Sequence, residues 1–117
     1  MSFKANVVKR KEGVYIMSLV GSLDGNAYGE CDKQVDSLVL KPAKVLIFDM
    51  KELDYIASIG FAVFIKARRV IEEGGGVVAL VNLKPSIRKI FDTVKIMPDR
   101  LFAGIEEVDE YIKKTFS

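Results

Sequence analysis

The residue best placed to do chemistry in this sequence is Ser58, at the start of an unusually apolar segment. It is expected in the first turn of a helix over residues 58–73, where unpaired backbone amides and the helix dipole favour an anion. The hydroxyl can cap this helix through its own oxygen. A phosphate attached to it would be stabilised by the same amides and dipole. The residue types alone favour the plain cap, because capping serines are common, and leave the reversible switch open.

Three carboxylates precede that helix and offer a second candidate site. Asp49, Glu52 and Asp54 lie at the end of a predicted strand and in a loop expected over residues 51–57. Carboxylates can bind a hard cation, but three of them on a loop are more often solvated. The chain has no histidine, which excludes Ser-His-Asp and Cys-His sites. It also has no phosphate-binding glycine loop. An enzyme is therefore the least favoured class, and we expect no catalytic residue, metal or cofactor.

The charge balance, the single cysteine and the short apolar runs argue against several further classes of protein. Eighteen basic residues face sixteen acidic ones, and a net charge of +2 gives no field that would attract nucleic acid or a membrane. Cys31 is the only cysteine and lies on an apolar helical stripe, which predicts a buried, inert thiol. No apolar run is longer than that of residues 61–65, which is far shorter than the ~20 residues of a membrane span. We expect a cytoplasmic protein without membrane insertion.

The period of the apolar residues predicts the order of the elements. Alternation indicates strands in the first part of the chain, spacing of three and four indicates helices, and two continuous apolar runs indicate strands covered on both faces. Glu12-Gly13 predicts the turn of a hairpin, Asp24 or Asn26 can cap the first helix, and Lys41-Pro42 stops it. Pro98-Asp99-Arg100 breaks the chain before the last elements. The expected strands cover residues 3–11, 14–20, 44–50, 77–81 and 101–102, and the helices 27–39, 58–73, 86–93 and 105–115.

This pattern predicts a single α/β domain over residues 1–117. Its sheet should be mixed and mostly parallel, with four to five strands joined by right-handed crossovers and four helices. No repeat, linker or low-complexity tract divides the chain.

Three blocks of this sequence resemble the STAS-domain, anti-sigma-factor antagonist family, and their order spans essentially the whole chain. Residues 21–24 are similar to the family's glycine-x-leucine-aspartate turn, and residues 46–60 to its central strand, loop and switch segment. Residues 82–91 are similar to its short third helix. The resemblance implies a STAS-like fold and a small regulatory protein of bacterial transcription. Such a protein binds an anti-sigma factor, itself a serine kinase, and thereby releases a sigma factor.

The resemblance also implies roles for individual residues. Ser58 matches the serine whose phosphorylation ends binding, and Asp24 matches an acidic residue beside it. With Asp54, Asp24 is expected to form the charged rim of a partner surface, whose contact residues we expect to be Ala57, Ile59, Gly60 and Phe61. The family's switch usually reads aspartate, serine, serine or threonine, glycine, whereas this chain has alanine before Ser58 and isoleucine after it. That apolar switch suits a constitutive binder or a different partner.

Two alternatives stay open beside the anti-sigma-factor antagonist. One is a STAS module of another signalling, scaffold or transport-associated complex, with or without phosphorylation. The other, least favoured, is the acidic-cluster enzyme. A weak homodimer is compatible with either binding role.

Overall fold

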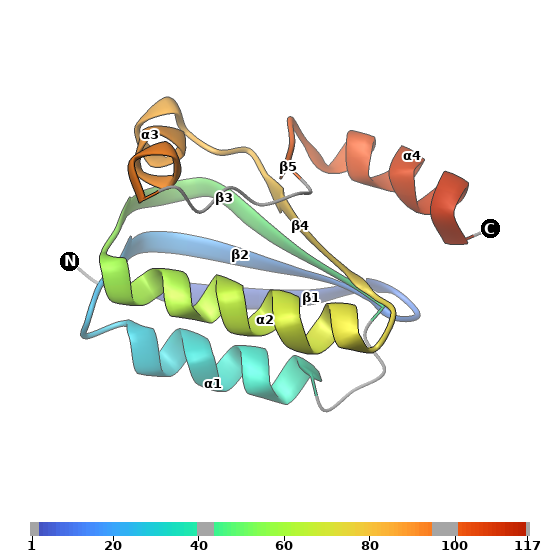
Figure 1. The fold of residues 1–117 in the computed structure, drawn as a ribbon, viewed down its shortest axis with the longest axis horizontal. Helices are drawn as coiled ribbons and strands as arrows, with labels where there is room; N and C mark the ends of the chain where they lie inside the picture. Colours follow the sequence, from blue (N-terminus) through green and yellow to red (C-terminus); the bar gives the residue numbers. More distant parts are fainter. Residues whose placement is uncertain (1–2, 40–43, 95–100, 117) are drawn as a thin grey trace.

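Five strands form one mixed sheet in the described part of the chain, residues 3–39, 44–94 and 101–116 of the computed structural model (Figure 1). The strand order is β1-β2-β3-β4-β5, so every strand lies beside its neighbour in sequence. β1 is antiparallel to β2, and the remaining pairs are parallel. The elements are β1 (Lys4–Lys11), β2 (Val14–Leu23), α1 (Tyr28–Val39), β3 (Val45–Ile56), η1 (Ser58–Gly60), α2 (Phe61–Glu73), β4 (Val77–Val81), α3 (Pro85–Val94), β5 (Leu101–Phe102) and α4 (Ile105–Phe116). The predicted fold class is confirmed.

The first two strands form the predicted hairpin, but β2 is longer than expected. Gly13 supplies the positive φ of 76° that the tight turn requires. The sequence pattern predicts that the second strand ends before Gly21, whereas β2 continues to Leu23. Gly21 is buried, has a φ of 94° and lies where the register between β2 and β3 shifts. A glycine inside a strand often marks such a bulge, and here it bends the strand without ending it.

The third strand also extends beyond its predicted end. Residues 51–57 are expected to form a loop, yet β3 runs without a break to Ile56. The extension pairs in parallel with the end of β2, where Ser22 lies opposite Tyr55 and Leu23 lies opposite Ile56. Leu53 and Ile56 of this extension are fully or almost fully buried. The predicted loop is therefore wrong, because hydrogen bonding to β2 makes these residues a strand.

The described α-helices agree with prediction in number and differ at their ends. The expected helix over residues 58–73 is a 3₁₀ turn, η1, followed by α2. α3 begins at Pro85, one residue before the predicted start, and proline is well suited to the first position of a helix. Asp24 is the residue that caps α1: its Oδ1 accepts hydrogen bonds from the backbone N–H groups of Asn26 and Ala27, both at 3.0 Å. The predicted stop at residues 41–42 and the break at 98–100 lie outside the described residues.

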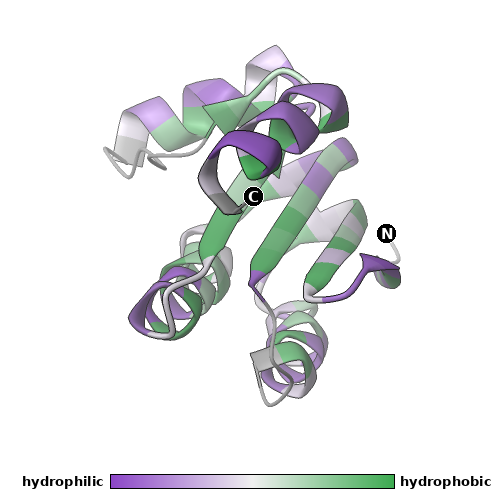
Figure 2. Cartoon of the chain, turned by 90° about the vertical axis from the view of Figure 1, so that its right-hand side faces the viewer, coloured by the Kyte–Doolittle hydropathy of each residue, from purple (hydrophilic) through white to green (hydrophobic). Residues whose placement is uncertain are grey.

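The helices cover the sheet unequally. α1 and α2 lie side by side along one face, and α3 lies over the far end of β3 (Figure 1). The large core cluster fills this α1–α2 face, with side chains of all three helices packed on β2, β3 and β4. α4 covers part of the opposite face, the α4 face, over a smaller cluster. Figure 2 shows the result, in which largely hydrophobic strands lie between helices whose outer sides are hydrophilic.

Cys31 belongs to the α1–α2 face and has no exposed surface. Burial, reinforced by the neighbouring Asp32 and Glu30 carboxylates, raises the pKa of its thiol to about 12. The thiolate is the reactive form of cysteine, so the predicted buried, inert thiol is confirmed. None of the helices in the described ranges combines the length and the apolar character that crossing a bilayer requires.

Candidate functional site

The ends of β2 and β3 and the η1 turn meet in one place, which we call the β2–η1 junction (Leu23, Asp24 and residues 56–60). The backbone N–H of Ala57 donates to the carbonyl oxygen of Leu23 at 2.9 Å, and Gly60 N–H donates to Ala57 O at 2.8 Å. A Cβ atom on Gly60 would lie 2.8 Å from Leu23 O and 3.0 Å from a side-chain carbon of Ile56. Only glycine lets the start of α2 approach β2 this closely, so the turn is held against the sheet.

Ser58 is exposed at the outer tip of this junction. The cap of η1 is Ala57, the cap of α2 is Gly60, and neither helix start receives a side-chain hydrogen bond. The prediction that Ser58 caps the helix is therefore wrong. Across the described residues the Ser58 hydroxyl has no hydrogen-bond partner. The extension of β3 explains the difference, because it carries the chain directly into a 3₁₀ turn and leaves the serine inside that turn.

The backbone around Ser58 can accommodate an anion. The first N–H groups of a helix have no partner within it, and here these include the amides of Ser58 and Ile59. The turn leads directly into α2, whose aligned peptide dipoles add partial positive charge at this end. A phosphate on the Ser58 oxygen would lie close to both.

The two predicted rim carboxylates have different surroundings. Asp24 lies within the junction and is partly exposed, while one of its oxygens holds the start of α1. Asp54, on the extension of β3, is 52% exposed and forms an ion pair with Lys84 at 2.7 Å. The rim beside the junction therefore carries both signs of charge.

The predicted contact residues divide into exposed and buried ones. Ile59 is 51% exposed and Ala57 is half-buried, so both are accessible from outside. Gly60 is buried, and Phe61 is 3% exposed with its ring edge-on to Phe91, the centroids 4.7 Å apart. The expectation that Gly60 and Phe61 lie on the contact surface is wrong, because the tight approach of α2 to the sheet turns both inward.

Tyr55 is an exposed apolar residue that the sequence pattern does not indicate. It is 51% exposed and lies on β3 one residue before Ile56, close in the chain to Ile59. The buried residues beside it, Leu53 and Ile56, are three apart and so depart from the strict alternation of a strand. The register between β2 and β3 shifts at this point. No pattern within the segment could therefore have shown that Tyr55 points outward.

The three carboxylates before α2 do not all converge: Asp49 and Glu52 line one hollow of about 220 Å³, and Asp54 is not part of it. Asp49 Oδ1 accepts hydrogen bonds from the Lys51 backbone N–H and from Asn82 Nδ2, both at 3.1 Å. Asp54 is engaged with Lys84 instead. In the part of the chain that the structure describes, no three acidic or cysteine side chains are grouped so that they could hold a metal ion. The described residues therefore do not bring Asp49, Glu52 and Asp54 together as the acidic-cluster alternative requires.

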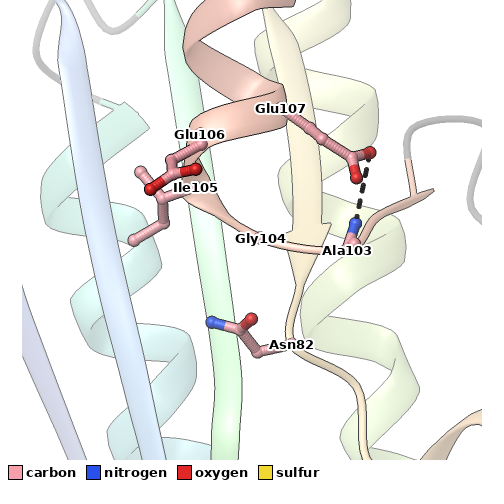
Figure 3. Close-up of a pocket in the computed structure, with 6 residues that line it drawn as sticks. All are labelled: Asn82, Ala103, Gly104, Ile105, Glu106 and Glu107. Carbon is pink, nitrogen blue, oxygen red and sulfur yellow. Dashed lines mark hydrogen bonds between the residues drawn. The ribbon is translucent and has the colours of Figure 1, made fainter.

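A hollow of about 470 Å³ lies at the start of α4, and none of the residues of the β2–η1 junction lines it (Figure 3). It is lined by Asn82 and by residues 103–107. The Glu107 carboxylate, in the first turn of α4, accepts a hydrogen bond at 3.4 Å from the backbone N–H of Ala103, which precedes the helix. Asn82 has a positive φ of 59°, a conformation that asparagine tolerates better than most residues. Its residue type therefore indicates a turn but does not indicate a hollow.

Comparison with known proteins agrees with this fold. The model of the STAS domain family matches residues 5–108. The anti-sigma F factor antagonist of Paenibacillus polymyxa is 25% identical over 95 residues, which are 78% of this chain and 81% of that protein. The unphosphorylated form of the anti-sigma factor antagonist SpoIIAA has the same fold, with a TM-score of 0.71 and 22% identity over 96% of this chain and 98% of that one. A structure of the phosphorylated form of Bacillus SpoIIAA also has a TM-score of 0.71, at 18% identity over 92% of this chain and 99% of that one.

The same fold occurs inside a much larger protein. The murine anion transporter Slc26a9 matches with a TM-score of 0.75 and 17% identity, over 88% of this chain but 18% of the transporter. At this identity the likeness concerns the fold alone. Because the family model spans most of the residues, the chain belongs to the STAS domain family.

Proposed function

We propose that this chain is an anti-sigma-factor antagonist: it binds an anti-sigma factor and so releases a sigma factor, and phosphorylation of Ser58 ends that binding. The proposal places the protein in the cytoplasm, where sigma factors act, and gives it no catalytic role of its own. Its family membership and its similarity to the anti-sigma F factor antagonist of Paenibacillus polymyxa support it. The observation that carries it is the exposed, unbonded hydroxyl of Ser58 on a turn held in place by Gly60.

Phosphorylation at this position changes charge without requiring the fold to change. A phosphoserine carries a charge of about −1.5 to −2 at neutral pH. The Ser58 hydroxyl gives up no hydrogen bond when it is modified, and the Leu23–Gly60 contact that holds the turn lies beneath it. The dianion would project beside Ile59 and Tyr55, the exposed apolar residues that we propose as the contact surface. Covering those residues would then require burying charge, which is costly.

The test is incubation of the full chain with a candidate serine-kinase anti-sigma factor and ATP, followed by intact-mass and peptide mass spectrometry. We expect one phosphate on the wild type, located on Ser58, and none on Ser58→Ala. Binding of the same partner should fall by at least about tenfold on phosphorylation, as expected when a charge enters an apolar interface. No phosphate on the wild type, or equal phosphate on Ser58→Ala, would remove Ser58 from the proposal.

A matched pair of variants tests the contact surface separately from the modification. Ile59→Asp and Ile65→Asp both place a carboxylate at an apolar residue that is about half exposed, at 51% and 50%. Ile59 lies in the junction, whereas Ile65 lies farther along α2. We expect only Ile59→Asp to lose partner binding. Equal losses would show that the contact surface is not centred on the junction.

A second candidate is a STAS module that serves a transport-associated complex without phosphorylation. The fold of this chain also occurs inside the anion transporter Slc26a9, and the apolar Ala57 and Ile59 on either side of Ser58 suit a module that is not phosphorylated. The gene neighbourhood separates the two. A neighbouring gene for an ATP-binding serine kinase supports the antagonist, and a neighbouring permease gene supports the transport-associated module.

A further inference from the structure

The outer edge of β1 is the longest open strand edge in the described part of the sheet. β1 pairs with β2 alone, and seven of its eight residues are exposed. Near its start the carbonyl oxygen of Ala5 accepts a hydrogen bond from Gln34 Nε2 at 2.9 Å. At the other edge, β5 has only two residues and leads directly into α4. An open edge presents unpaired backbone N–H and C=O groups that can bind an added strand, so β1 is the place where another chain could extend this sheet.

The charges of β1 have one sign. Four of its eight residues are basic, and none is acidic. Lys9 is paired with Glu12 and Arg10 with Asp109, both at 2.6 Å. Lys4 and Lys11, at the two ends of the strand, have no ion-pair partner within the described residues. The edge thus offers two uncompensated positive charges separated by the length of the strand.

The middle of β1 is apolar on both sides. Val7 is 36% exposed and Val8 is 59% exposed, and they are two of the five large apolar side chains exposed in the described residues. Successive residues of a strand point to opposite faces, so an added strand would find an apolar side chain to pack against on each face. The remaining three, Tyr55, Ile59 and Ile65, lie on β3, η1 and α2.

A second copy of this chain is a poor occupant of the edge. Antiparallel pairing of two β1 strands about Val7 and Val8 places Lys4 of one opposite Lys11 of the other, at both ends. Like charges directly opposite each other destabilise a strand pair, whereas opposite charges stabilise it. Charge complementarity instead favours a segment with acidic ends and an apolar centre.

From these observations we propose that β1 is a docking edge for an extended, acidic segment of another protein, which adds a sixth strand to the sheet. This surface does not depend on Ser58 or on the junction, so it goes beyond the proposed function and can fail independently of it. Backbone hydrogen bonds supply the attachment, and Lys4 and Lys11 select the acidic ends.

The experiment uses the full chain and synthetic eight-residue peptides of alternating valine and threonine. One peptide has glutamate at both ends, a matched one has lysine there, and a third is the glutamate peptide with alternate backbone nitrogens methylated. Fluorescence anisotropy should show that the glutamate peptide binds at least about tenfold more tightly than the lysine peptide, from the summed cross-strand charge pairs. Methylation should abolish binding, and amide chemical shifts should change mainly along β1.

A charge reversal gives the matched control. Both lysines are exposed, so the double variant Lys4→Glu, Lys11→Glu should keep its fold, which circular dichroism checks. It should reverse the preference and bind the lysine peptide better. Equal binding of both peptides, binding that survives methylation, or shift changes confined to other elements would overturn the proposal. Dimerisation of the chain through β1, or binding to anionic vesicles without binding to the glutamate peptide, would overturn it as well.

Discussion

The two faces of the sheet differ in the number of apolar side chains that are buried against them. Among the described residues, twenty-three buried ones form the cluster of the α1–α2 face, against seven on the α4 face, so most of the packing stability should come from the first. The larger cluster contains aromatic pairs, such as Phe48 and Phe64 with centroids 4.8 Å apart. The seven buried residues of the smaller one are all aliphatic. The junction residues Leu23, Ile56 and Phe61 belong to the larger cluster, which explains how an exposed turn is held on a rigid base.

The sharpest test of this difference uses two neighbouring residues of β3. Leu46 and Ile47 are both fully buried, but Leu46 belongs to the α1–α2 face and Ile47 to the α4 face. We expect Leu46→Ala to lower the free energy of unfolding by about 4 kcal/mol and Ile47→Ala by about 2 kcal/mol, the upper and lower parts of the usual range. The thinner α4 layer can relax around the cavity. Urea denaturation measures both, and equal losses would show that the two faces are equally well packed.

A smaller effect is expected at the junction. Gly60→Ala places a Cβ atom 2.8 Å from the carbonyl oxygen of Leu23, and a backbone atom cannot move aside as a side chain can. We expect a loss of about 2 kcal/mol, typical of overpacking. Gly25→Ala is the control, because no atom lies within 4 Å of its added Cβ. A Gly60→Ala protein as stable as Gly25→Ala would mean that α2 is not pinned to β2, and that the turn bearing Ser58 is loosely held.

The smallest effect concerns the link between β1 and α4. Arg10 and Asp109 form an ion pair at 2.6 Å, and their side chains are 39% and 29% exposed. Partly exposed pairs contribute about 0.2–1 kcal/mol, so a double-mutant cycle with alanine should return a coupling in that range. The coupling should shrink at high salt. A coupling free energy well above this range would show that α4 is bound to the sheet more firmly than its small cluster of buried residues suggests.

Local periodicity was sufficient to predict most of this fold. The hairpin turn at Glu12-Gly13, the buried runs of β3 and β4 and the helix that begins at Pro85 all follow from patterns within a few residues. The second half of β3 does not, because Lys51, Glu52 and Asp54 give it the composition of a loop. Only its pairing with the end of β2, far away in the sequence, makes it a strand.

The candidate site shows the same limit. Ser58 and Ile59 can be singled out from residue type and are exposed, but their part in binding and modification stays a prediction. The inward orientation of Gly60 and Phe61 depends on the approach of α2 to Leu23 and Phe91. That approach is a tertiary contact, and a pattern confined to one helix cannot contain it.

The sequential order of the strands has a consequence for how the chain is made. Each strand pairs with the strand synthesised immediately before it, from β1 to β5. A nascent chain leaving the ribosome therefore always has the partner of its newest strand already available, and each pairing step closes a loop that contains either one turn or one crossover connection. Growth of the sheet can follow translation directly, from the amino-terminal hairpin onward. The α4 helix, which emerges after all five strands, then covers its face of a sheet that is already assembled.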